Sequence, residues 1–144
     1  MSSFKIFDIA GSAMNAQSLR LNLVASNLSN AESVSSSINQ TYRARHPVFA
    51  TQLQEALAQQ GEIKERNIAS GVKVLGVVES QTPPVMEYAP ENPLANADGY
   101  IFKPNVNPIE EMTNMIAASR SYQDNAEVAN TAKQLMLQTL RMGQ

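Results

Sequence analysis

The sequence predicts a mainly α fold, with a small β-rich insertion between two long terminal helices. Two observations predict the helices: residues 109–142 contain neither Pro nor Gly, and apolar residues recur at three- and four-residue steps there and in residues 4–30. The insertion is predicted because the intervening chain changes to a two-residue period broken by prolines. We expect the terminal helices to pair as an antiparallel coiled-coil-like unit, with a β-hairpin domain between them. The expected domains are a discontinuous helical one over residues 1–35 and 105–144, and a loop plus small β-rich one over residues 36–104.

The first helix is expected over residues 4–30. Its apolar stripe is interrupted once, by Gln17, and the region Asn27–Asn30 is expected to end it. Gly11 and several Ser and Asn residues lower the helix propensity, so this helix needs a partner along most of its length. The stripe residues that we expect to pack against other helices are Phe7, Met14, Leu21, Val24 and Leu28.

The next segment is the least determined part of the chain. Residues 31–46 are polar and Ser-rich, which is typical of a loop or linker. The apolar residues of 47–57 fit either a short amphipathic helix or an extended arm, and the sequence leaves this choice open.

Three short extended segments follow. Residues 72–78 are rich in Val and alternate like a strand, with Gly76 as a possible bulge. Residues 85–88 are expected to form a second strand after the break at Pro83-Pro84. The Asp98-Gly99 pair predicts a turn, and residues 100–103 should extend after it.

The second long helix has a well-marked start. Asn107 can serve as the N-cap, Pro108 takes the first helical position, and Glu110 falls at the third, in a capping-box arrangement. Glu110 and Glu111 also place negative charge at the positive end of the helix dipole. The helix should be roughly 50 Å long at 1.5 Å per residue. Ser119 and Lys133 are polar breaks in its apolar stripe, which comprises Ile109, Met112, Met115, Ile116, Tyr122, Ala126, Ala129, Met136, Leu137 and Leu140. All of these except Met115 and Leu137 are expected to pack against other helices.

The stripe alone fits two interpretations: it faces the core of its own monomer, or it packs against helices of other subunits. A narrow seam rich in Ala and Met suits close packing between long helices. We expect the two helices to be stable only in a larger assembly, because the ordering entropy of so many helical residues outweighs the burial that one pair supplies.

Composition excludes several classes of function. The formal net charge is −2, with 11 basic and 13 acidic residues, so no cationic field attracts nucleic acid. No apolar run approaches the ~20 residues of a membrane span, so direct membrane insertion is not expected, and the N-terminus lacks the pattern of a conventional secretory signal. The chain has no Cys.

No constellation of catalytic, cofactor-binding or metal-ligating residues stands out. His46 is the only histidine and lacks partners at triad or metal-site spacing. Glu110 and Glu111 are adjacent, so on a helix they point about 100° apart and cannot act together on one substrate. The six glycines form no phosphate-binding loop. We therefore expect no enzyme activity, no cofactor and no small-molecule substrate.

Several motifs, taken together, resemble bacterial flagellar basal-body rod proteins. They are Asn27-Leu28-Ser29-Asn30 within residues 20–30, Tyr42-Arg43 with residues 47–50, residues 95–100, Pro104-Asn105-Val106-Asn107-Pro108 with residues 109–112, and residues 118–122 with Asn125. The resemblance covers both termini and touches the middle of the chain.

The resemblance implies a structural subunit of the proximal rod. Its terminal helices would pair and stack with those of neighbours in a hollow helical drive shaft that spans the periplasm and transmits torque. It also implies flagellar type III export without a cleavable signal. The implied partners are copies of itself, other flagellar rod proteins, and basal-body export and ring components. The alternative function belongs to another class, the binding modules. In that case the protein would be a soluble helical export chaperone or adaptor that binds a client protein through the same apolar stripes.

The segment before the second helix is expected to join the tube-forming helices to the outer β-domain. The residues expected at this joint are Asp98, Gly99, Tyr100, Pro104, Asn105, Asn107 and Pro108.

Overall fold

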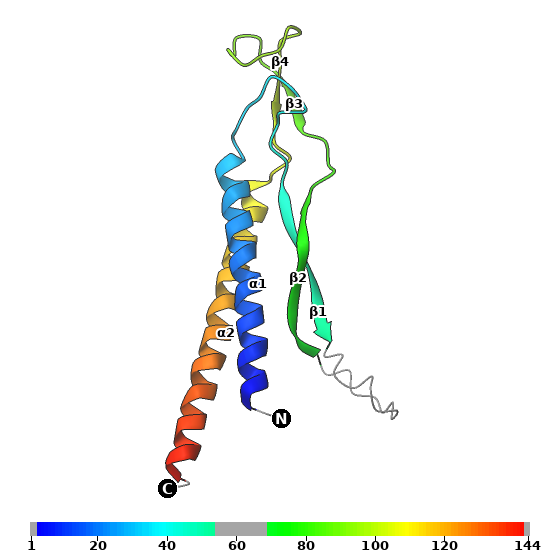
Figure 1. Cartoon of the computed structure of the whole chain (residues 1–144). Helices are drawn as coiled ribbons and strands as arrows, with labels where there is room; N and C mark the ends of the chain where they lie inside the picture. Colours follow the sequence, from blue (N-terminus) through cyan, green and yellow to red (C-terminus); the bar gives the residue numbers. More distant parts are fainter. Residues whose placement is uncertain (1–2, 54–68, 143–144) are drawn as a thin grey trace, which may run out of the picture.

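A computed structural model describes residues 3–53 and 69–142 of the chain (Figure 1). The prediction of two long terminal helices around a small β region is confirmed. In chain order the elements are α1 (Ser3–Asn30), β1 (Arg45–Leu53), β2 (Ala69–Glu79), β3 (Val85–Tyr88), β4 (Tyr100–Lys103) and α2 (Pro108–Met142).

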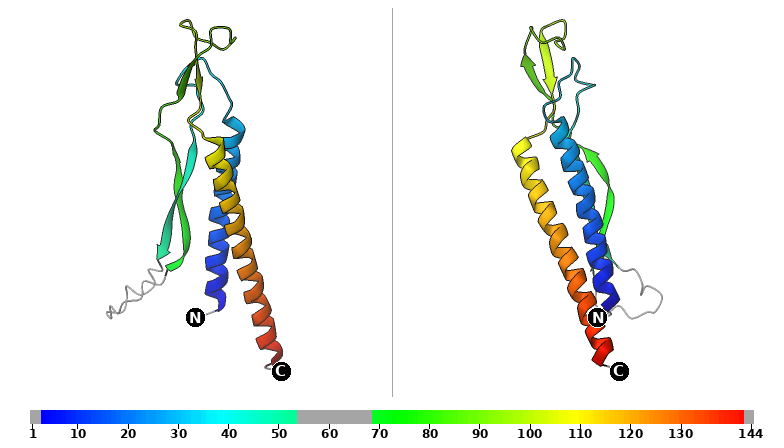
Figure 2. Two further views of the ribbon diagram at one scale, coloured as in Figure 1. Left: turned by 180° about the vertical axis from the view of Figure 1, so that it is seen from behind. Right: turned by 90° about the vertical axis from the view of Figure 1, so that its left-hand side faces the viewer.

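The two helices lie side by side and run in opposite directions, as predicted (Figures 1 and 2). The C-terminal end of α2 extends beyond the start of α1 in every view. The β1–β2 ribbon packs along α1 on the side away from α2. Within the described ranges, α2 therefore has α1 as its only neighbouring helix or strand, and much of its surface faces solvent.

Strands β1 and β2 form an antiparallel ribbon. For residues 47–57 the sequence left open a short helix or an extended arm. The structure shows an extended strand up to Leu53, and residues 54–57 lie outside the described residues. The bulge expected at Gly76 lies beside it: Val48 pairs with Gly76 and Phe49 with Val74, so Leu75 is the extra residue. A second irregularity follows between Thr51 and Leu53.

Strands β3 and β4 form a separate antiparallel hairpin beyond the top of the helix pair (Figure 1). Both have the predicted bounds. Tyr88 and Tyr100 pack edge to face across the strands, with ring centroids 5.2 Å apart. Residues 31–44 form a loop, in which Ser35 bridges to Phe102 of β4. The sequence predicts a loop up to residue 46, but β1 begins at Arg45, so the last two of these residues are paired as strand.

The core is thin because small side chains fill it. Asn27 is the largest fully buried side chain in the described part of the chain. The buried apolar residues are Ala10, Ala16, Val24, Ala31, Ala44, Ile101 and Ala118. Alanines let the helices approach closely but remove little apolar surface from water, so the helix pair gains limited stability from its own packing.

Asn107 caps α2 as predicted, with one difference in detail. Its side-chain oxygen accepts from the backbone N–H of Ile109 at 3.1 Å, which is the second helical position rather than the third, occupied by Glu110. Its backbone oxygen accepts from Glu111 N–H at 3.0 Å. Glu110 is exposed, whereas Glu111 is buried.

Candidate assembly surfaces and the joint that positions them

Asn27 connects α1, β1 and α2 through one buried amide. Its Nδ2 group donates to the backbone oxygen of Arg45 at 3.0 Å and to Glu111 Oε2 at 3.1 Å. Its Oδ1 atom accepts from Arg45 N–H at 2.9 Å and from the Tyr42 hydroxyl at 2.8 Å. Both donors and both acceptor positions of the amide are thus used. We call Asn27, Tyr42, Arg45 and Glu111 the joint cluster.

A second asparagine ties the base of the ribbon to the segment before α2. Asn105 Oδ1 accepts from Ala44 N–H at 2.9 Å, and its Nδ2 group donates to the backbone oxygen of Thr82 at 2.6 Å. Ser80 N–H in turn donates to the Ala44 oxygen at 2.8 Å. The start of β1, the end of β2 and the segment before α2 therefore lie next to one another. These hydrogen bonds fix the direction in which the ribbon leaves the helix pair.

The far part of the ribbon is fixed to α1 by a close backbone approach. The hydroxyl of Ser12 accepts from Val72 N–H at 3.1 Å and donates to the Ile9 oxygen at 2.9 Å. Gly71 has a φ of +135° and is buried against Ser12, where a Cβ atom would clash with the hydroxyl oxygen. Nearer the joint, the Arg20 guanidinium lies 5.3 Å from the centroid of the Phe49 ring.

The predicted packing residues differ between the two helices. On α1 all are at least partly covered, because this helix has neighbours on two sides: Phe7, Met14, Leu21 and Leu28 are half-buried and Val24 is buried. On α2 the set divides: Ala126, Ala129 and Met136 are half-buried, whereas Ile109, Met112, Ile116, Tyr122 and Leu140 are exposed. The exposed members include Ile109, 76% exposed, and Leu140, 68% exposed, near the two ends of α2.

The residues expected at the joint are found in two places. Pro104, Asn105 and Asn107 lie between β4 and α2, and Pro108 is the first residue of α2, so all four are next to the joint cluster. Asp98 and Gly99 lie in the loop that links β3 to β4, and Tyr100 begins β4, so the length of β4 separates them from the helix start. Gly99 has a φ of +82°, and there its N–H donates to the Asn96 oxygen at 3.0 Å.

Sequence reasoning did not identify Asn27 or Glu111 as buried contacts. A signal was present: Asn27 is three residues after Val24 and four before Ala31, so a polar residue falls on the buried stripe of α1. Glu111 is likewise seven residues before Ala118, the other buried residue of α2. Gln17, expected only as a break in the stripe, has a buried Oε1 atom without a hydrogen-bond partner among the described residues.

None of the helices in residues 3–53 and 69–142 combines the length and hydropathy needed to cross a membrane. Over the same residues, no group of acidic or histidine side chains is arranged to hold a metal ion. His46 lies exposed on β1.

Comparison with known proteins gives consistent results for the two ends of the chain. A family profile described as "Flagella basal body rod protein" matches residues 7–34, and one described as "Flagellar basal body rod FlgEFG protein C-terminal" matches residues 97–142. The first match contains Asn27 and most of α1, and the second contains β4 and α2.

Full-length relatives extend this similarity to the middle of the chain. The chain is 51% identical over 144 residues to the flagellar basal-body rod protein FlgC of Salmonella typhimurium, covering all of both proteins. It is 50% identical to FlgC of Escherichia coli over the same length. It is 29% identical to FlgC of Bacillus subtilis, covering 99% of each chain. The chain belongs to the FlgC family of flagellar basal-body rod proteins.

Proposed function

We propose that this protein is a structural subunit of the proximal part of the flagellar rod, and that it assembles through its two terminal helices. The relatives named above are rod proteins, and none of them is described as a chaperone or adaptor. The proposed partners are copies of itself, other rod proteins, and the basal-body export and ring components. The proposed location is the periplasm-spanning rod, reached by flagellar export without a cleavable signal.

The observation that carries the assembly mode is the uncovered apolar surface of α2. Ile109, Met112 and Ile116 are all exposed, although their spacing places them along one side of the helix. A side chain of this kind gains stability only when another surface removes it from water. Among the described residues of this helix, only Glu111 and Ala118 are buried. The remaining face is available to helices of neighbouring subunits.

Replacing Met112 by Asp should block rod assembly and abolish swimming while leaving the free protein folded. Met112 is about half exposed, so the substitution should change the monomer's free energy of unfolding by no more than ~0.5 kcal/mol. Motility is measured in a strain that carries the variant as its only copy, and stability is measured on the purified chain.

Met112→Leu is the matched control, because it keeps an apolar side chain of similar volume and should preserve swimming. Normal swimming with Met112→Asp, and also with Leu140→Asp, would show that these exposed residues are not assembly contacts. Complete rods in a strain that lacks the gene would contradict the structural role itself.

A further inference from the structure

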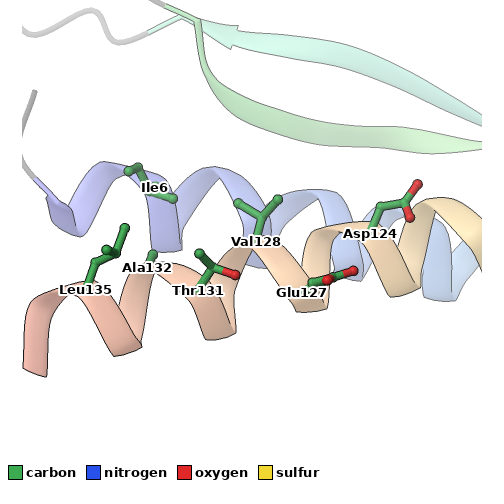
Figure 3. A pocket seen from close by; sticks show the side chains of 7 residues that line it. All are labelled: Ile6, Asp124, Glu127, Val128, Thr131, Ala132 and Leu135. Atoms are coloured by element: carbon green, nitrogen blue, oxygen red, sulfur yellow. The ribbon is translucent and has the colours of Figure 1, made fainter. Parts of the chain in front are cut away.

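A groove runs between the N-terminal turns of α1 and the second half of α2 (Figure 3). Its volume is about 520 Å³. Figure 3 shows the lining side chains projecting from successive turns of α2, with Ile6 of α1 opposite Leu135 and Ala132. Ile6, Val128 and Leu135 give it an apolar floor and are all exposed. Asp124 and Glu127 line its end nearest the middle of α2.

The groove therefore combines an apolar floor with negative charge at one end. Asp124 and Glu127 are exposed, and neither forms a salt bridge with any described residue. A suitable occupant would be a helix that carries a cation about one turn ahead of aliphatic side chains. Such a helix could pair its charge at the acidic end and bury its aliphatic side chains on the floor.

The same chain presents such a helix on another side of α2. Lys133, Leu137 and Leu140 are exposed and follow one another at four- and three-residue steps. Lys133 precedes Leu137 by four residues, as Asp124 precedes Val128. Lys133 also lacks a salt bridge within the described part of the chain. We call Lys133, Leu137 and Leu140 the C-terminal ridge.

We propose that the groove of one copy receives the C-terminal ridge of a second, parallel copy. This inference rests on the proposed rod function and specifies one of its contacts. A shift of nine residues aligns Lys133 with Asp124 and Leu137 with Val128, since 133 − 124 and 137 − 128 are both nine. The corresponding displacement along the helix axis is about 13.5 Å at 1.5 Å per residue.

Helix geometry supports the parallel arrangement. Nine residues at about 100° each make two and a half turns, so the aligned residues project from opposite sides of α2. Each copy can then contact one neighbour through its groove and another through its ridge. In an antiparallel arrangement Lys133 would lie away from the acidic end. A contact between two different surfaces does not close on itself as a two-fold dimer does, and it can continue around a ring or along a helix.

Engineered disulfides test this contact directly, because the chain contains no cysteine. In assembled basal bodies, the double variant Val128→Cys/Leu137→Cys should cross-link on mild oxidation into dimers and higher multimers of this chain. Facing helices 8–10 Å apart place opposed Cα atoms within disulfide range. The single variants Val128→Cys and Leu137→Cys are the matched controls and should remain monomeric.

Each other outcome of the oxidation would overturn the proposed contact. Dimers formed by a single variant would indicate a two-fold contact instead. Cross-links to a different rod protein would assign the groove to that protein. No cross-link in assembled rods would show that the ridge does not occupy the groove.

Charge exchange provides a second test. Asp124→Lys and Lys133→Glu should each cause loss of swarming, because each variant places like charges together at the contact. The double variant Asp124→Lys/Lys133→Glu restores an opposite pair and should recover swarming. Failure of the double variant to exceed either single variant would contradict the pairing.

These results are distinguishable from failure of the proposed function. If this groove contact is wrong but the rod role is right, the cysteine variants will swim and be present in basal bodies without cross-linking. If the rod role is wrong, the protein will be absent from purified basal bodies.

Discussion

At the scale of single residues, the joint cluster depends on one amide that both donates and accepts hydrogen bonds. The Asn27 side chain offers a donor to Glu111 and to the Arg45 backbone oxygen, and an acceptor to Tyr42 and the Arg45 N–H. The group is fully buried, so water cannot take over these roles. A buried polar group without a partner costs about 1–3 kcal/mol.

Asn27→Ala should therefore lower the free energy of unfolding by roughly 3 kcal/mol, since it leaves several buried groups without partners. Chemical denaturation of the purified chain measures this change. Asn30→Ala is the matched control from the same Asn-Leu-x-Asn motif. Among the described residues the Asn30 amide bonds only the Ser26 oxygen, at 2.8 Å, so its loss should cost about 1 kcal/mol or less. Equal effects of the two substitutions would remove the special role given to Asn27.

A second substitution of Asn27 distinguishes its role as a hydrogen-bond acceptor from its role as a donor. Asn27→Asp keeps an acceptor for Tyr42 but places a carboxylate against Glu111. Repulsion between the two carboxylates favours protonation of one of them. The variant should be least stable near neutral pH and should recover stability as the pH is lowered. A variant equally unstable at pH 5 and pH 7 would show that charge repulsion is not the cause.

At the scale of elements, the ribbon is held against α1 at both ends. The joint cluster and Asn105 fix its base, and the contact of Gly71 with Ser12 fixes its far part. A two-stranded ribbon is marginally stable alone, so docking on α1 is required for β1 and β2 to persist.

Gly71→Ala should loosen this docking. Gly71 has a φ of +135°, a backbone conformation that residues with a side chain rarely adopt. The Cβ of an alanine at this position would also clash with the Ser12 hydroxyl. Backbone strain of this kind costs about 1–3 kcal/mol. We expect a lower Tm and faster hydrogen exchange in β1 and β2. Gly76→Ala is the control from the same strand, because no atom of the described residues lies within 4 Å of the position that an added Cβ would take. A Gly71→Ala variant as stable as Gly76→Ala would contradict the docking.

Elements with local signals could be predicted from the sequence, and elements that depend on distant contacts could not. The start of α2 followed from Asn107 and Pro108, and β3 followed from the prolines that precede it. The conformation of β1 stayed open because its pairing partner begins many residues later, beyond the reach of local periodicity.

The same limit applied to the candidate site. Asn27 and Glu111 are 84 residues apart, and only the tertiary fold brings them together. The packing role of the helix stripes and the division into residues 1–35 with 105–144 and residues 36–104 remain predictions. A stripe shows which side of a helix is apolar, but it does not identify the molecule that covers that side.

At the scale of the whole molecule, the single chain covers its two helices unequally. Helix α1 lies between α2 and the ribbon, whereas α2 packs only on α1 among the described elements and extends past its start (Figure 2). Leu135, Leu137 and Met142 are exposed in this second half of α2. Segments with few buried apolar contacts open at low free-energy cost, so the last turns of α2 should be the least stable part of the helix pair.

Hydrogen exchange on the purified chain and on assembled rods should therefore differ most in residues 128–142. In the free chain these amides should exchange rapidly, and residues 20–30 of α1 should be better protected by the joint cluster. Assembly should slow exchange in residues 128–142 by roughly a hundredfold, equivalent to about 2.7 kcal/mol of added stability. The internal control is the β3–β4 hairpin, which lies away from the groove and the ridge and should change less. Full protection of residues 128–142 in a dilute monomer would show that the single chain stabilises this helix without neighbours, and subunit packing would not be needed to order it.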